Sequence, residues 1–153
     1  MKTVLIICMT ILIVVLFALF FLGKRSASGQ AIGLVDGKLA MCPDTPNCVC
    51  SEYANETGHY IEPIETAEAR ITEMDLVQGF VKSMGGTIQS HSDNYLSATF
   101  SSSLFSFVDD VEVRIDAELK VIHFRSASRV GRGDLGVNRK RIEQLKELLN
   151  GTQ

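Results

Sequence analysis

The residues best suited to chemistry lie between Arg125 and Arg141, where the chain reads RSASRVGRGDLGVNRKR. This stretch holds six basic side chains and three glycines, at the point where a predicted strand passes into a predicted helix. Guanidinium forks, free backbone N–H groups and a helix N-terminus can together bind a phosphate, a sulfate or a carboxylate. The same residues can also form structural salt bridges, and the sequence leaves both interpretations open.

A candidate ligand site follows from this stretch. We expect it to consist of Arg125, Arg129, Arg132, Arg139, Gly136 and Asn138. Three carboxylates are near enough in sequence to neutralise these arginines, namely Asp109, Asp110 and Asp134, and they are too few to satisfy every guanidinium group. Asn138 is a good candidate for the helix cap, and the glycines let the preceding backbone turn tightly.

The alternative function is a hydrolase-type enzyme that uses Asp109, Asp110 and His123 beside the arginines. A histidine near carboxylates commonly acts as the general acid or base in catalysis. However, the chain contains no Gly-x-Ser-x-Gly elbow, no Walker loop and no dinucleotide fingerprint, and we therefore expect no cofactor. A non-enzymatic binding module is the favoured interpretation.

The elements that must position these residues form an α+β pattern. Helices are predicted from Thr66 to Met84, with Gly85 and Gly86 as the stop, and over residues 137–149. Strands are predicted over residues 59–64, 87–92, 95–100, 111–116 and 121–127, with residues 104–108 leading into the fourth. Meandering strands with helices on one face predict a single two-layer domain with a mostly antiparallel sheet.

Alternation along the last predicted hairpin sorts its side chains into two faces. One face carries Val111, Val113, Ile115, Ile122 and Phe124, and the other carries Glu112, Arg114, His123 and Arg125. A register shift of two residues preserves this sorting. The pattern therefore predicts a cross-strand ion pair between Arg125 and either Glu112 or Asp110.

The N-terminus carries an uncharged apolar run from Val4 to Leu22, nineteen residues long, which is enough to cross a bilayer as a helix. We interpret residues 1–25 as a transmembrane signal anchor, while Ser26-Ala27-Ser28 leaves cleavage of a signal peptide open. Residues 26–39 then form a flexible tether, and residues 40–150 form one globular domain. Basic residues flank the run on both sides, so charge does not fix its orientation.

Three cysteines crowd into the segment CPDTPNCVC at residues 42–50. Two prolines between Cys42 and Cys48 force a tight turn that can bring these sulfurs within disulfide range, which suits an oxidising compartment. The alternatives are free thiols, or a metal site in which three thiolates act with His59 but without the usual Cys-x₂-Cys spacing. We favour the disulfide over a metal, and therefore an extracytoplasmic domain, in the periplasm or at the cell surface.

Charge is unevenly spread along the chain. Residues 31–118 carry four basic and fifteen acidic groups, whereas residues 119–153 carry eight basic and three acidic groups. The two halves are expected to pair within one fold. No aromatic residue interleaves with the basic ones over residues 125–149, which argues against nucleic acid as a partner. The expected partners are the membrane and an anionic ligand or an envelope protein.

Three segments of the chain resemble one family. They are CPDTPNCV at residues 42–49, FVDDVE at residues 107–112 and the stretch over residues 125–141. The family is the domain of unknown function 1499, found in bacteria and plastids and often placed behind a membrane or export segment, and the resemblance covers residues 39–149. It supports the fold and the location but brings no established reaction. Serine is associated with position 50 in that family, which favours Cys42 with Cys48 over any role for Cys50.

Overall fold

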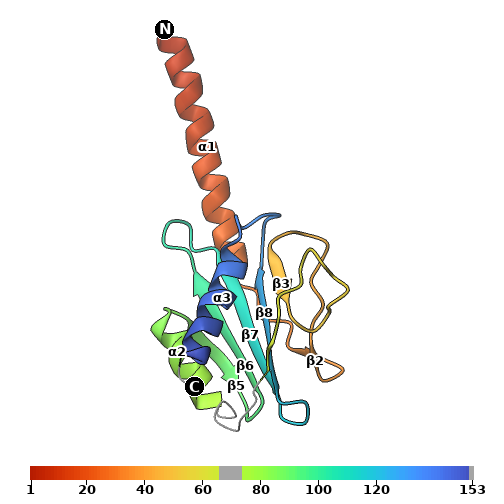
Figure 1. The fold of residues 1–153 in the computed structure, drawn as a ribbon. Coiled ribbons are helices and arrows are strands. Elements are labelled where there is room, and N and C mark those ends of the chain that lie inside the picture. The colour runs from red at the N-terminus through yellow and green to blue at the C-terminus, as the bar shows by residue number, and fades with distance from the viewer. Residues whose placement is uncertain (66–73, 152–153) are drawn as a thin grey trace.

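The computed structural model describes residues 1–65 and 74–151 of the 153-residue chain. A long helix, α1 (Lys2–Ala27), projects from a domain in which two helices cover one face of a sheet (Figure 1). These helices are α2 (Met74–Ser83) and α3 (Val137–Asn150). The predicted α+β class, with a mostly antiparallel sheet behind one N-terminal apolar helix, is confirmed.

The main sheet is an antiparallel meander of β5 (Thr87–His91), β6 (Tyr95–Ser101), β7 (Val108–Asp116) and β8 (Val121–Ser128). Along the outer edge of β8 lie β3 (Cys48–Cys50) and β4 (Ile64–Glu65), both antiparallel to it. A separate hairpin pairs β1 (Leu34–Val35) with β2 (Lys38–Leu39). The meander occupies the positions that alternation predicted, and β7 extends further toward the N-terminus.

Two predicted elements differ from the structure. The strand expected over residues 59–64 is wrong, because Tyr60 makes only an isolated bridge with Cys50 and β4 begins after Pro63, which has no N–H to offer a sheet. The helix expected from Thr66 is described from Met74, and its first part, residues 66–73, lies outside the described residues.

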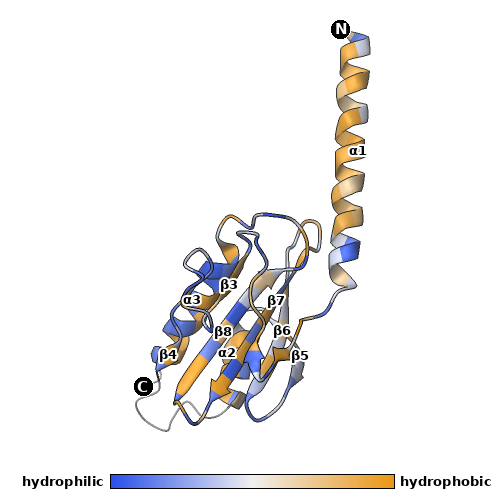
Figure 2. Ribbon diagram, turned by 90° about the vertical axis from the view of Figure 1, so that its right-hand side faces the viewer, coloured by the Kyte–Doolittle hydropathy of each residue, from blue (hydrophilic) through white to orange (hydrophobic). Residues whose placement is uncertain are grey.

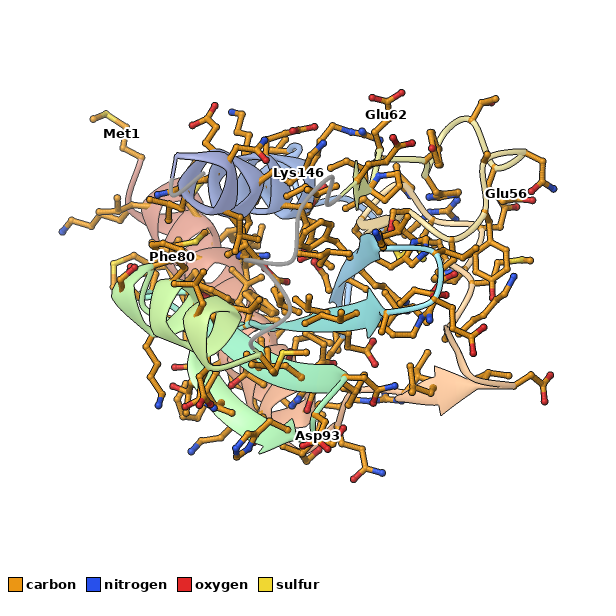
Figure 3. All side chains as sticks on the ribbon, turned by 60° about the horizontal axis from the view of Figure 1, so that its bottom comes forward. Met1, Glu56, Glu62, Phe80, Asp93 and Lys146 are labelled. Carbon is orange, nitrogen blue, oxygen red and sulfur yellow. A yellow bond between two sulfur atoms is a disulfide. The ribbon has the colours of Figure 1, made fainter. Side chains whose placement is uncertain are left out.

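The face of the sheet toward α2 and α3 is apolar and forms the core. Val113 and Phe124 stand opposite each other in the β7–β8 register, and both are 0% exposed. The two helices add Val77, Val81, Ile142, Leu145 and Leu149 to this cluster. Figure 3, where Phe80 marks α2 and Lys146 marks α3, shows side chains filling the space between these helices and the strands. Each buried Leu, Ile or Phe contributes roughly 1.5–3 kcal/mol to folding.

The opposite face of the sheet is polar, and orange and blue bands alternate along β7 and β8 in Figure 2. It is crossed by the strap, residues 28–33, which joins α1 to β1. Instead of a flexible tether, residues 26–39 contain the β1–β2 hairpin, and Leu39 at its end is 0% exposed. The segment is ordered because its backbone finds hydrogen-bond partners on the sheet: the Gly33 N–H donates to Glu112 over 2.8 Å.

Helix α1 is long and apolar enough to span a membrane. Its mean hydropathy reaches 3.3, and none of that stretch is buried against the rest of the protein. Near its C-terminal end, however, Gly23 and Ser26 are buried. The helix therefore has an apolar stretch that the described residues leave unburied and a last turn that packs on the domain.

Candidate ligand-binding site

Arg125 and Glu112 form a buried ion pair in the middle of the polar face. They stand opposite each other in the register of β8 and β7, as strand parity predicted. The Arg125 Nη1 donates to Glu112 Oε2 over 2.8 Å, and the two side chains are 3% and 0% exposed. Burying two charges costs several kcal/mol per ion unless good geometry and further hydrogen bonds compensate. The surroundings of the pair supply some of those bonds.

Glu112 accepts two further hydrogen bonds at its other oxygen. The Tyr95 hydroxyl and the Gly33 N–H both donate to Glu112 Oε1 over 2.8 Å. Burial, reinforced by the charge of Glu112, raises the pKa of Tyr95, so its hydroxyl stays protonated as a donor. One carboxylate thereby joins the strap to three strands of the sheet.

Arg125 is less completely paired than Glu112. Among the described residues, its Nε is a buried nitrogen without a hydrogen-bond partner. Arg125 lines a cavity of about 410 Å³, together with Asp110, Ala127, Ser128, Arg129, Gly29, Gln30, Ile32, Met41, Cys42 and Pro43. A buried donor without an acceptor costs about 1–3 kcal/mol.

Arg129 lies beside the same cavity and connects the sheet to α1. It holds Asp110 at two points, through Nε to Oδ2 over 2.9 Å and Nη2 to Oδ1 over 2.7 Å. Its remaining nitrogen, Nη1, donates to the carbonyl oxygen of Ser26 over 3.2 Å and to that of Ala27 over 3.4 Å. A cation at the C-terminal end of a helix is stabilised by the helix dipole. Arg129 therefore uses part of its hydrogen-bonding capacity to hold the C-terminal end of α1 against the sheet.

Residues of the strap line two cavities on the polar face. Gly29, Gln30 and Arg129 line both of them. The second cavity has a volume of about 640 Å³ and extends over β5 and β6, where its hydroxyl-bearing residues are Ser90, Tyr95, Ser97, Thr99 and Ser101. A Cβ on Gly29 would lie 3.0 Å from Arg129 Cδ, so a side chain at this position would have to displace Arg129 by a few tenths of an ångström. The candidate site thus has a guanidinium side and a hydroxyl side.

A different arginine, Arg141, serves the core face. Its Nη2 donates to Asp109 Oδ2 over 2.8 Å, and its guanidinium carbon lies 4.7 Å from the Phe100 ring centroid. Its Nη1 donates to Asn138 Oδ1 over 2.7 Å and to Ser126 Oγ over 3.1 Å. This cluster is a structural contact between α3 and the sheet.

The start of α3 corrects the prediction for Asn138. The N-cap is Gly136, at φ +77°, and Asn138 is fully buried in the first turn, where its amide nitrogen donates to the Asn47 carbonyl over 2.9 Å. The capping side chain is Asp134, whose carboxylate accepts the Gly136 N–H over 3.1 Å and the Asn138 N–H over 2.7 Å. Burial opposes the ionisation of Asp134, but these hydrogen bonds outweigh it and lower its pKa. The Asp134 carboxylate therefore accepts the hydrogen bonds from the backbone N–H groups that we expected a ligand to accept.

The arginines of the predicted site are divided between the two faces of the sheet. Arg125 and Arg129 lie on the polar face, whereas Arg139 belongs to α3 on the core face. Arg132 is exposed in the loop before α3, and within the described residues neither Arg132 nor Arg139 forms an ion pair. The structure thus brings together only two of the four arginines, around a cavity that the sequence did not indicate.

The residues of the hydrolase alternative do not come together. Asp109 and Asp110 are adjacent on β7 and point to opposite faces. His123 lies four residues along β8 from Ala127, the register partner of Asp110, a separation of about 13 Å. His123 instead contacts Ser51 Oγ over 3.1 Å, and burial lowers its pKa.

The cysteine segment holds a disulfide between Cys42 and Cys48, the pairing that the sequence favours. Cys50 is a buried free thiol, and burial raises its pKa. His59, the fourth member of the metal alternative, has its Nδ1 3.1 Å from the Cys48 carbonyl oxygen. The disulfide borders the smaller cavity, since Cys42 and Pro43 line it.

Sequence reasoning did not identify Tyr95, Gly33 or Ser26 as parts of the site. Tyr95 could have been found by extending the parity argument from β7 to β6, because Tyr95 and Ser97 fall on the face that carries Glu112. Gly33 contributes its backbone N–H, and Ser26 contributes its backbone carbonyl oxygen. No pattern of side chains in the sequence predicts such contacts.

The comparison with protein families agrees with the motifs. The family model described as "Protein of unknown function (DUF1499)" matches residues 38–149. The chain therefore belongs to this family, and the match covers the sheet, α2, α3 and both cysteines of the disulfide. A comparison with curated proteins found no match.

Proposed function

We propose that this protein is a single-pass, membrane-anchored envelope protein whose domain binds an anionic ligand on the polar face of its sheet. The observation that carries the proposal is the Arg125 guanidinium, which is almost fully buried, lines a cavity and keeps one nitrogen without a partner. A ligand oxygen that meets this guanidinium group in the cavity would form a charge-assisted hydrogen bond with it.

Anchoring through α1 is supported by its length and composition. The apolar run from Val4 to Leu22 matches the thickness of a bilayer, since nineteen residues rise about 28 Å as a helix. The disulfide between Cys42 and Cys48 favours an extracytoplasmic domain, because disulfides persist in oxidising compartments.

The lining of the smaller cavity favours an anionic amphiphile, such as a fatty acid or an alkyl phosphate. Arg125 and Arg129 provide cationic groups, and the remaining wall includes the apolar side chains of Ile32, Met41 and Pro43. A carboxylate or phosphate matches the fork of a guanidinium group. An alkyl chain matches the apolar wall, because contact with that wall removes the apolar surface of both from water.

The test is the binding of a fluorescent fatty acid and a fluorescent alkyl phosphate to the full chain in detergent. The test variant is Arg125→Gln combined with Glu112→Gln, which removes both members of the buried pair and so leaves no uncompensated charge. The control is Arg132→Ala, which removes an exposed arginine outside the cavity. We expect saturable binding by the wild type and the control, and loss of binding by the double variant. Equal binding by all three proteins would refute the site.

A further inference from the structure

Two loops stand on either side of α1 where it leaves the domain. One joins β6 to β7 and the other joins β8 to α3, and both reach the level of the last turns of α1 in Figures 1 and 2. If α1 spans a bilayer, these loops are the parts of the domain nearest to the lipid headgroups. The side chains of these loops therefore determine which contacts the domain makes with the membrane surface.

The junction between α1 and the domain is tightly packed. A Cβ on Gly23 would lie 1.8 Å from the Phe105 carbonyl oxygen, so the β6–β7 loop touches the helix directly. The Ser26 hydroxyl accepts the Val108 N–H over 2.9 Å and lies 3.3 Å from the Val108 carbonyl oxygen, and Arg129 binds the last carbonyls of the helix. These contacts fix the direction in which α1 leaves the sheet.

The same contacts set the height of the loop relative to the bilayer. Gly23 directly follows Leu22, the last residue of the apolar run. If α1 spans a bilayer, Phe105, whose carbonyl oxygen touches Gly23, lies at the depth where the hydrocarbon region ends. Its neighbour Leu104 is 78% exposed and consequently sits at the interface between hydrocarbon and headgroups.

The second loop presents a comparable apolar tip. Leu135 is 98% exposed and has a φ of +55°, a backbone conformation that is uncommon for a bulky residue. Val137, at the start of α3, is 45% exposed. Arg132 lies in this loop, and Lys24 and Arg25 occupy the last turn of α1. Exposed leucines among cations form a surface that matches an anionic lipid interface.

We infer that Leu104 and Leu135 insert into the interface of the bilayer that α1 spans, with Arg132 against its phosphate groups. This inference rests on the proposed anchoring by α1. The domain then meets the membrane at three places, and the polar face is held at a fixed orientation to the lipid. Ala27, at the end of α1, lines the larger cavity, so this cavity also lies next to the headgroups.

The test uses variants of the full chain that each carry one introduced, solvent-accessible cysteine, in vesicles of phosphatidylcholine and phosphatidylglycerol. The background carries Cys8→Ser, since Cys8 is an exposed free cysteine, while the disulfide and the buried Cys50 are retained. An environment-sensitive fluorophore is placed by Leu104→Cys, Leu135→Cys or Leu119→Cys. Leu119 is the matched control, because it is 71% exposed in the turn between β7 and β8, at the end of the domain away from α1 (Figure 1).

We expect a blue shift and quenching by nitroxide-bearing lipid at positions 104 and 135, and neither effect at position 119. Vesicles of phosphatidylcholine alone should reduce the quenching at position 135, because Arg132 then faces a zwitterionic surface without net negative charge. A fourth variant, Val14→Cys, reports whether α1 is inserted. An inserted α1 with water-exposed labels at 104 and 135 would overturn this inference alone, whereas a water-exposed label at 14 would overturn the anchoring and the inference together.

Discussion

The two faces of the sheet are built from alternate residues of the same strands, yet they are stabilised in different ways. On one face Val113 and Phe124 pack against α2 and α3, and burial of apolar surface accounts for the stability. On the other face Glu112 and Arg125 are equally buried but are held by paired charges and hydrogen bonds. The helix-covered face thus serves as the core, whereas the strap-covered face retains cavities and, among the described residues, a buried donor without a partner.

The largest expected effect is on the apolar face. Phe124→Ala removes a fully buried ring and should lower the free energy of unfolding by about 3–5 kcal/mol. Urea denaturation of the full chain in detergent measures this change. The control Leu119→Ala, at an exposed position, should stay within about 0.5 kcal/mol of the wild type. Similar losses for the two variants would contradict the assignment of the core.

The corresponding change on the polar face is Arg125→Met. It leaves the Glu112 carboxylate buried without its cation, which should cost about 3–5 kcal/mol of unfolding free energy. Adding Glu112→Gln should recover much of this loss, because the glutamine oxygen can still accept from Tyr95 and Gly33. A denaturation series of the single and double variants measures the coupling. A double variant less stable than Arg125→Met would show that the loss does not come from an unpaired charge.

The disulfide beside the polar face should contribute less. Replacing Cys42 and Cys48 together by serine opens a short loop, for which chain entropy gives a loss of about 2–3 kcal/mol. Thermal unfolding with and without reductant measures it. Reductant should lower the melting temperature of the wild type and leave that of the double-serine variant unchanged. A variant that still responds to reductant would point to a different thiol.

The smallest effect concerns His123, on the polar face next to Ser51 and Glu52. Burial lowers its pKa, so the unfolded chain binds the proton more readily than the folded chain. The stability that neutral His123 contributes is complete above about pH 6.5 and is lost as the pH falls through that value toward the folded-state pKa. The wild type should therefore lose stability relative to His123→Asn on acidification, as denaturation at a series of pH values shows. Parallel pH profiles of the two proteins would argue against a depressed pKa.

Local patterns predicted much of this comparison. Period-two alternation placed Glu112 and Arg125 on one face and Val113 and Phe124 on the other, because a strand allows only two side-chain directions. Apolar residues at helical spacing located α3, whose first turn holds Asn138. The cap was misassigned because Asp134 reaches forward from the loop to the Asn138 N–H, an arrangement that depends on the loop conformation and not on residue type alone.

The parts that could not be predicted depend on contacts between distant segments. The composition of residues 26–39 is typical of a tether, but the Gly33 N–H is held by Glu112, which is 79 positions away. Arg129 meets the carbonyl oxygen of Ser26 across a separation of 103. Backbone groups are the same in every residue, so no sequence pattern reveals which of them a buried carboxylate or guanidinium will bind.

Native mass spectrometry of the full chain, extracted from membranes in detergent and incubated with an alkyl phosphate, tests the central claim most directly. We expect a bound anionic amphiphile on the wild type and on Arg132→Ala, and none on the variant that combines Arg125→Gln with Glu112→Gln. An adduct retained equally by the double variant, or no adduct on the wild type, would contradict the claim that the polar face binds an anion through Arg125.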